Sequence, residues 1–153
     1  MATETNPTVQ TNIEEQNMEL MQTLDDAWNG QDLETFAKRH KDDVVVRWPG
    51  LPPTHGVADH RAEAIAFFKT FPDQHLDNRP YKVLIARGDW TCSVAQFTGS
   101  MGGPMKGSDG KEIPATGRKF EVDVCAVARW DDGKIVEENL LGERIHHVER
   151  DAC

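Results

Sequence analysis

Hydrophobic residues in the first part of the chain recur three or four positions apart, the spacing of one face of an α-helix. The pattern predicts a helix over residues 11–29 that ends at Gly30. Its largely apolar stripe consists of Ile13, Asn17, Leu20, Met21, Leu24, Ala27 and Trp28. We expect the polar residues 1–12 to form a disordered tail before a single domain over residues 13–150.

Two shorter helices are predicted from their N-cap residues. Asp32 favours a helix over residues 33–40, and Asp59 favours one over residues 60–71, ended by Pro72. We expect His60, at the start of the later helix, to lie at the surface.

A β-branched run predicts a strand over residues 44–48, between these two helices. Residues 49–53, rich in proline and glycine, can only be a loop.

The second half of the chain changes to the patterns of β-strands. Strands are predicted over residues 76–86, with an interruption near Pro80, and over residues 90–100 after a Gly88-Asp89 turn. Residues 101–117 are rich in glycine and proline and are expected to form a long loop. Two long strands follow. Hairpin-linked strands after helices predict an α+β fold, with an antiparallel sheet and the helices on one face.

The last two strands are joined by Asp132-Gly133, a strong signal for a two-residue turn. Such a turn places Glu143 opposite Val122, and it places Arg144 opposite Glu121 as a favourable charge pair. One face would then carry Phe120, Val122, Val124, Ala126, Ala128 and Trp130, with Ile135, Glu137, Asn139, Leu141 and Glu143 from the second strand. A three-residue loop with a bulge is the alternative, and it would move Glu143 to the other face.

Composition narrows the possible partners. The formal net charge is −9 and lysines and arginines do not cluster, which argues against nucleic acid and anionic membranes as partners. No apolar run approaches the roughly 20 residues of a membrane span. The N-terminal residues lack the pattern of an export signal. Three scattered cysteines match no zinc spacing and indicate a reducing compartment, so we expect a cytoplasmic protein.

Five short motifs, in this order, resemble those of the SnoaL-like polyketide cyclases, or ester cyclases, within the nuclear transport factor 2-like superfamily. They are Phe71-Pro72-Asp73-Gln74-His75, Gly88-Asp89-Trp90, Phe97-Thr98-Gly99-Ser100-Met101-Gly102, Pro114-Ala115-Thr116-Gly117-Arg118 and Asp132-Gly133-Lys134-Ile135-Val136-Glu137. The resemblance implies a cone-shaped curved sheet closed by helices around an apolar pocket, and a homodimer or homotetramer. It also implies cofactor-free intramolecular aldol closure of a polyketide ester.

Three positions depart from the family pattern. Glu143 stands where many members have their catalytic Asp, Asn139 where many have Trp, and Met101 where many have His. Glutamate keeps the carboxylate but moves it about one methylene outward.

Glu143 is the predicted catalytic acid/base, because an apolar pocket raises the pKa of a carboxyl toward neutrality. His75 is the predicted polar partner of this carboxylate. Substrate-binding positions are predicted at the pocket mouth and on the apolar hairpin face: Trp48, His55, Met101, Val122, Val124, Ala126, Trp130, Asn139 and Leu141.

The function predicted from the sequence is acid/base chemistry on a small apolar carbonyl compound, in the first place aldol cyclisation. The alternatives are hydrolysis, dehydration or isomerisation in the same pocket, or non-catalytic binding of a lipophilic molecule. No metal or other cofactor is expected, because adjacent His146 and His147 point to opposite sides of a strand and no glycine-rich nucleotide fingerprint is present.

Overall fold

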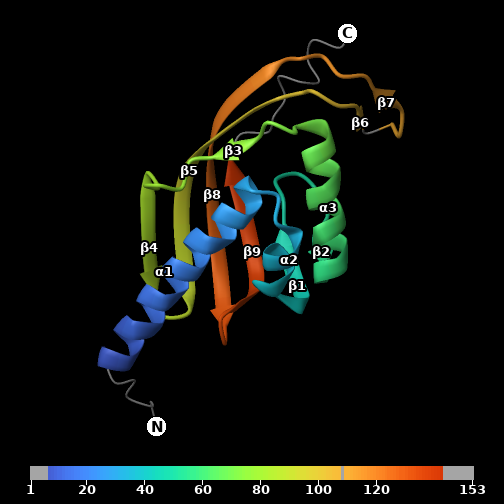
Figure 1. Cartoon of the computed structure of the whole chain (residues 1–153). Helices are drawn as coiled ribbons and strands as arrows, with labels where there is room; N and C mark the ends of the chain where they lie inside the picture. Colours follow the sequence, from blue (N-terminus) through green and yellow to red (C-terminus); the bar gives the residue numbers. More distant parts are fainter. Residues whose placement is uncertain (1–6, 108, 143–153) are drawn as a thin grey trace.

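The computed structural model describes residues 7–107 and 109–142. Three helices lie on one side of a curved sheet that does not close into a barrel (Figure 1). This confirms the predicted α+β class, with the helices together on one face.

The first helix, α1 (Pro7–Asn29), begins inside the segment predicted as a tail and ends at the predicted residue. Helix α2 (Leu33–Lys38) is capped as predicted, since the Asp32 carboxylate accepts a hydrogen bond from the backbone N–H of Thr35. It ends earlier than expected, because the chain enters a strand at His40.

Helix α3 (Val57–Thr70) starts three residues before the predicted start, and its N-cap is Gly56 rather than Asp59. Gly56 has a φ of 92°, which glycine adopts at little cost. With this earlier start, His60 is the fourth residue of the helix and not its first. Its side chain is buried, so the predicted surface position was wrong.

The main sheet has the strand order β2 (Thr54–His55), β1 (His40–Arg47), β9 (Lys134–Gly142), β8 (Lys119–Asp131), β5 (Trp90–Ser100) and β3 (His75–Leu76). Strand β4 (Val83–Arg87) also pairs with β5. The predicted strand over residues 76–86 is therefore two strands, β3 and β4. The sheet is mixed rather than antiparallel, because β1 runs parallel to β9.

A small second sheet lies in the segment predicted as a loop. Strands β6 (Met105–Lys106) and β7 (Glu112–Ile113) pair with each other at the end of the molecule near α3 (Figure 1). Met105 and Ile113 pack against the apolar cluster at that end, so this hairpin helps to cover the interior.

The β8–β9 hairpin has the predicted two-residue turn, with Asp131 paired to Lys134 and Trp130 to Ile135. Beyond this point Arg129 pairs with Glu137, so Val136 is an extra residue in β9. This bulge exchanges the two faces of β9. Glu138 and Leu140, rather than Glu137 and Asn139, lie on the same inward face as Ala126 and Ala128 of β8. The predicted pairing of β8 with β9 was therefore wrong beyond the turn.

The interior consists of two neighbouring apolar clusters between the helices and the sheet. One contains Met21, Leu24, Phe36, Val44, Val46, Ala64, Phe68, Ala126, Ala128, Trp130 and Ile135. The other contains Phe71, Phe97, Met101, Phe120 and Val122. Trp28 packs against both and so connects them.

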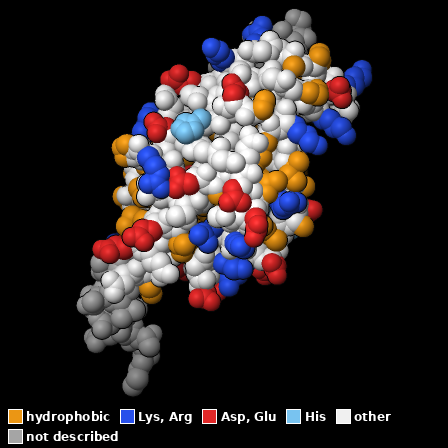
Figure 2. Space-filling view, in the orientation of Figure 1, with side chains coloured by type: hydrophobic (Ala, Val, Ile, Leu, Met, Phe, Trp, Pro, Cys, Tyr) orange, Lys and Arg blue, Asp and Glu red, His pale blue; other side chains and the backbone are white. Residues whose placement is uncertain are grey.

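On the face that carries the helices, acidic and basic side chains are interspersed (Figure 2). Within residues 7–107 and 109–142, no helix is both long and apolar enough to cross a membrane.

Candidate active site

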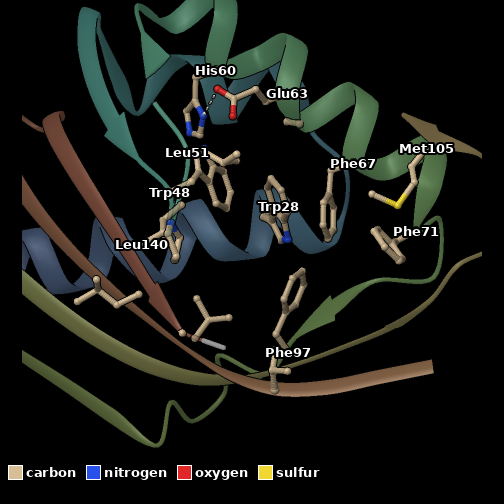
Figure 3. A pocket seen from close by; sticks show the side chains of 16 residues that line it. Trp28, Trp48, Leu51, His60, Glu63, Phe67, Phe71, Phe97, Met105 and Leu140 are labelled. Atoms are coloured by element: carbon tan, nitrogen blue, oxygen red, sulfur yellow. Dashed lines mark ion pairs between the residues drawn. The ribbon is translucent and has the colours of Figure 1, made fainter. Parts of the chain in front are cut away.

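A pocket of about 340 Å³ opens between α1, α3 and the sheet (Figure 3). Its wall is almost entirely apolar and aromatic. The lining residues are Trp28, Trp48, Pro49, Leu51, His60, Glu63, Ala64, Phe67, Phe71, Phe97, Met105, Val122, Val124, Leu140, Leu141 and Gly142. A pocket of this volume can enclose much of a small organic molecule.

His60 and Glu63 are the titratable groups in this wall. They lie one turn apart on α3, and His60 Nδ1 is 4.0 Å from Glu63 Oε1 (Figure 3). Both atoms are buried and neither has a hydrogen-bond partner within the protein. A ligand hydroxyl or enol between them could bond to both, so this end of the pocket is suited to a polar group of a ligand.

Burial sets the protonation of these two side chains. It lowers the pKa of His60 to about 4, and this exceeds the opposing effect of Glu138. Burial raises the pKa of Glu63, although the Thr54 and Trp48 side chains lower it in part. The imidazole is therefore neutral at pH 7, with one nitrogen available to accept a proton.

Two indole N–H groups add hydrogen-bond donors to the same pocket. Nε1 of Trp28 is buried without a partner. Nε1 of Trp48 is also buried and makes no well-formed hydrogen bond, but it lies close enough to the Glu63 carboxyl to lower the pKa of that group. Trp28 is held by tilted ring contacts with Phe67 and Phe68, at centroid distances of 5.5 Å and 4.7 Å. Both indoles could donate to a carbonyl oxygen of a ligand.

A smaller cavity of about 90 Å³ lies deeper and shares six lining residues with the main pocket: Trp28, Trp48, His60, Phe97, Val124 and Leu140. Its other polar lining groups are Asp25, Ser93 and Glu138. His60 thus stands between the two cavities.

Behind His60, Glu138 Oε2 lies 3.8 Å from His60 Nε2 and 3.3 Å from His40 Nε2. His40 Nδ1 in turn is 2.7 Å from the carbonyl oxygen of Phe36. Burial alone would raise the pKa of Glu138, but its hydrogen bond with His40 and the two nearby imidazoles lower it overall. These three buried side chains place three ligand atoms within 4.8 Å of one another, a set that could also hold a metal ion.

Asp25 is a second buried carboxyl, on α1. Its Oδ2 accepts a hydrogen bond from the Tyr81 hydroxyl at 2.6 Å. Burial raises the pKa of Asp25 to about 7, assisted by Glu138 and Asp26 and opposed by the bond from Tyr81. This carboxyl therefore holds its proton to a much higher pH than an ordinary aspartic acid does.

The structure places several of the predicted binding residues at these cavities. Trp48, Val122, Val124 and Leu141 line the main pocket, and Ala126 lines the smaller one. Leu141 reaches the pocket from the exposed end of β9, with 53% of its surface accessible.

Other predicted site residues lie elsewhere. His75 on β3 and His55 on β2 are exposed and line neither cavity. Met101 and Trp130 are fully buried in the two clusters, and Asn139 lies on the outward face of β9, where its Oδ1 accepts from Arg47. Glu143 lies outside the described residues.

The sequence reasoning missed His40, His60, Glu63 and Glu138. A helical wheel places His60, Ala64 and Phe67 together on one face of α3 wherever the helix starts, so this spacing could have indicated an inward His60. No comparable signal marks Glu138, because its inward direction depends on the bulge at Val136.

The sequence model of the SnoaL-like polyketide cyclase family matches residues 18–146. The chain therefore belongs to this family. Among curated proteins, no sequence matches the chain.

Solved structures share the fold at low sequence identity. A candidate SnoaL-like polyketide cyclase from Jannaschia sp. CCS1 is 21% identical with a TM-score of 0.75, over 93% of this chain and 92% of that one. A candidate polyketide cyclase from Xanthomonas campestris pv. campestris is 16% identical with a TM-score of 0.75, over 92% and 99% of the two chains. An LEH-like epoxide hydrolase from M. tuberculosis is 14% identical with a TM-score of 0.67, over 85% and 84%. Family and fold are consistent with an enzyme of the cyclase or isomerase type.

Proposed function

We propose that the protein is a cofactor-free acid/base enzyme that closes a ring by intramolecular aldol addition in an apolar, polyketide-like ester. The observation that carries the proposal is the unpartnered Nδ1 of His60, in an apolar pocket that also holds two unpartnered indole N–H groups. Membership of the polyketide cyclase family supports the choice of substrate class.

His60 is the proposed general base. The imidazole is neutral at pH 7, and its Nε2 faces the carboxylate of Glu138, which can only accept a hydrogen bond. The proton therefore belongs on Nε2, and Nδ1 carries the lone pair beside Glu63, whose side chain also lines the pocket. That lone pair can remove a proton from a carbon flanked by two carbonyl groups.

The indole N–H groups of Trp28 and Trp48 are the proposed stabilisers of the developing negative charge. Fixed donors in a water-poor site stabilise an enolate oxygen more strongly than water does. The enolate carbon then adds to a second carbonyl carbon of the same molecule, which forms the carbon–carbon bond and leaves an alkoxide. The alkoxide takes a proton from protonated His60, either directly or through Glu63, which then takes the proton held by His60, so that the enzyme is restored and the product is an isomer of the substrate.

Two other uses of the same pocket remain as alternatives. Solved structures with this fold include the epoxide hydrolase and a candidate ketosteroid isomerase from Kribbella flavida, so hydrolysis or isomerisation fits the same geometry. A binding protein for a lipophilic molecule would need the pocket but not the unpartnered base. We expect a homodimer or homotetramer, which sedimentation analysis tests directly.

Proton exchange tests the proposal without knowledge of the natural substrate. Aromatic ketones and β-keto esters are incubated with the protein in D₂O, and loss of the α-proton is followed by NMR. We expect catalysed exchange that falls by about 10² to 10⁴ in His60→Gln. Arg61→Gln, an exposed neighbour on α3, is the matched control and should keep the full rate.

Glu143→Gln and His75→Gln test the residues predicted from the sequence in the same assay. A loss confined to those two variants would assign the chemistry to them and refute the role of His60. Tight binding of a probe with no exchange in any protein would indicate a binding protein.

A further inference from the structure

We propose that Glu138 and His40 form a buried relay behind His60, in which Glu138 fixes the His60 tautomer and His40 fixes Glu138. Both are positioning residues, since neither is placed to touch a ligand in the main pocket. The inference rests on the proposed function of His60, and it adds the groups that make Nδ1 rather than Nε2 the basic nitrogen.

The first step concerns His40. Its Nδ1 is 2.7 Å from the backbone carbonyl oxygen of Phe36, and a carbonyl only accepts, so Nδ1 carries a proton. Its Nε2 faces Glu138 Oε2 at 3.3 Å. A lone pair on both of these atoms would be repulsive, so Nε2 donates a hydrogen bond to Oε2, in agreement with the lowered pKa of Glu138. The His40 side chain is fully buried, which excludes water as a substitute partner.

The second step concerns Glu138. The oxygen that interacts with His40 is the same Oε2 that lies 3.8 Å from His60 Nε2. This distance is about 0.6 Å longer than a normal hydrogen bond. Catalytic hydrogen bonds are often long without ligand and shorten in the complex. An acceptor on this side of the ring favours the proton on Nε2.

The third step is the direction of the free nitrogen. With the proton on Nε2, the lone pair of His60 is on Nδ1, the atom 4.0 Å from Glu63 Oε1 at the wall of the main pocket. When Nδ1 accepts a proton from the substrate, the imidazolium lies next to the Glu138 carboxylate, which stabilises its charge. An acid behind a catalytic histidine acts in this way in other enzyme classes.

Among the residues that the structure describes, the remaining titratable group at the smaller cavity is Asp25, on α1. Its Oδ2 already accepts a hydrogen bond from the Tyr81 hydroxyl, so the proposed relay consists of His40, Glu138 and His60.

The tautomer can be measured directly in the wild-type protein, with no substrate and no mutation. Long-range ¹H–¹⁵N correlation spectra of ¹⁵N-histidine-labelled protein at pH 7 should show His60 protonated at Nε2 and unprotonated at Nδ1. His60→Gln identifies the signal by its disappearance. A His60 protonated at Nδ1 would overturn the proposal, as would stoichiometric metal in the purified protein by elemental analysis, because the three side chains would then be metal ligands.

The role of Glu138 is tested by Glu138→Gln, which keeps the shape but allows the amide to donate as well as accept. We expect the His60 signals to move toward the Nδ1–H tautomer, and kcat for exchange to fall about 10- to 100-fold with little change in KM. The matched control is Glu137→Gln, the next residue, which lies on the outward face and pairs with Arg47. An unchanged tautomer in folded Glu138→Gln would refute the relay.

The two proposals can fail independently. If His60→Gln is inactive but the tautomer does not depend on Glu138, the relay is wrong and the proposed function stands. If the tautomer responds as expected but His60→Gln keeps full exchange activity, the arrangement exists and the proposed base is wrong.

Discussion

Glu138 lies opposite Ala128 in the β8–β9 ladder, and this pairing directs its carboxylate into the interior, where only 5% of the residue is accessible. Ala128 is fully buried and small, which leaves room above the sheet for the larger side chains around His40. The pairing exists because Val136 is an extra residue in β9. The bulge therefore has a direct consequence for chemistry, since it turns Glu138 and Leu140 inward in place of Glu137 and Asn139 and so puts the carboxylate of Glu138 behind the candidate base.

The register predicts opposite effects of aspartate at two adjacent positions. Leu140 lines both cavities and packs against the main cluster, whereas Asn139 lies on the outward face near Arg47. Leu140→Asp should lower the free energy of unfolding by about 2–4 kcal/mol, through lost apolar burial and a poorly solvated carboxylate.

Asn139→Asp is the control and should change stability by no more than about 0.5 kcal/mol. Urea unfolding followed by tryptophan fluorescence measures both variants. Equal destabilisation of the two would contradict the bulged register.

The indole donors predict a kinetic effect without a large structural one. Trp28→Phe or Trp48→Phe keeps an aromatic ring in the wall but removes an unpartnered N–H. If that group stabilises an enolate oxygen, kcat for exchange should fall by about 10²-fold, with a smaller change in KM. Trp90 lines neither cavity, so Trp90→Phe should keep the wild-type kcat. Full activity in both pocket variants would remove the indoles from the mechanism.

Much of the fold could be predicted because its signals are local. The end of α1, the Asp32 cap, strand β5 and the Asp132-Gly133 turn all depend on residues that are close in sequence. The parallel pairing of β1 with β9 could not be predicted in the same way, since it joins segments about ninety residues apart and no turn specifies it.

The site was less predictable than the fold for a related reason. Alternation along β9 predicts the inward residues only if no extra residue interrupts it, and one bulge exchanges every side chain beyond it. The start of α3 at Gly56 likewise makes His60 the fourth residue of the helix and not its first. Small local irregularities thus have little effect on the fold and a large effect on which polar groups face the pocket.

Two buried groups predict opposite effects of pH on stability. Asp25 has a pKa of about 7 in the folded protein against 3.8 ordinarily, so its contribution to stability is complete below pH 4 and is lost as pH rises to 7. His60 has a pKa of about 4 against 6.5, so its contribution is complete above pH 6.5 and is lost as pH falls to 4. The two effects largely cancel in the wild type.

Single variants should reveal each effect. As the pH rises from 4 to 6.5, the free energy of unfolding of Asp25→Asn should increase by up to about 3 kcal/mol, because only the His60 effect remains. In His60→Gln the free energy of unfolding should instead decrease as the pH rises over this range, because only the Asp25 effect remains. Urea unfolding at pH 4.5, 5.5 and 6.5 gives the slopes. If both variants retain the pH dependence of the wild type, neither group has the shifted pKa.

The pKa of His60 also predicts the pH dependence of catalysis. A general base acts only when unprotonated, and burial keeps this imidazole unprotonated down to about pH 4. The acid limb of kcat/KM for α-proton exchange should therefore lie near pH 4, well below the 6.5 of an ordinary histidine. Glu138→Gln removes the nearby carboxylate, which raises the pKa of His60, so this variant should shift the limb to lower pH. A wild-type limb near pH 6.5 would exclude His60 as the base.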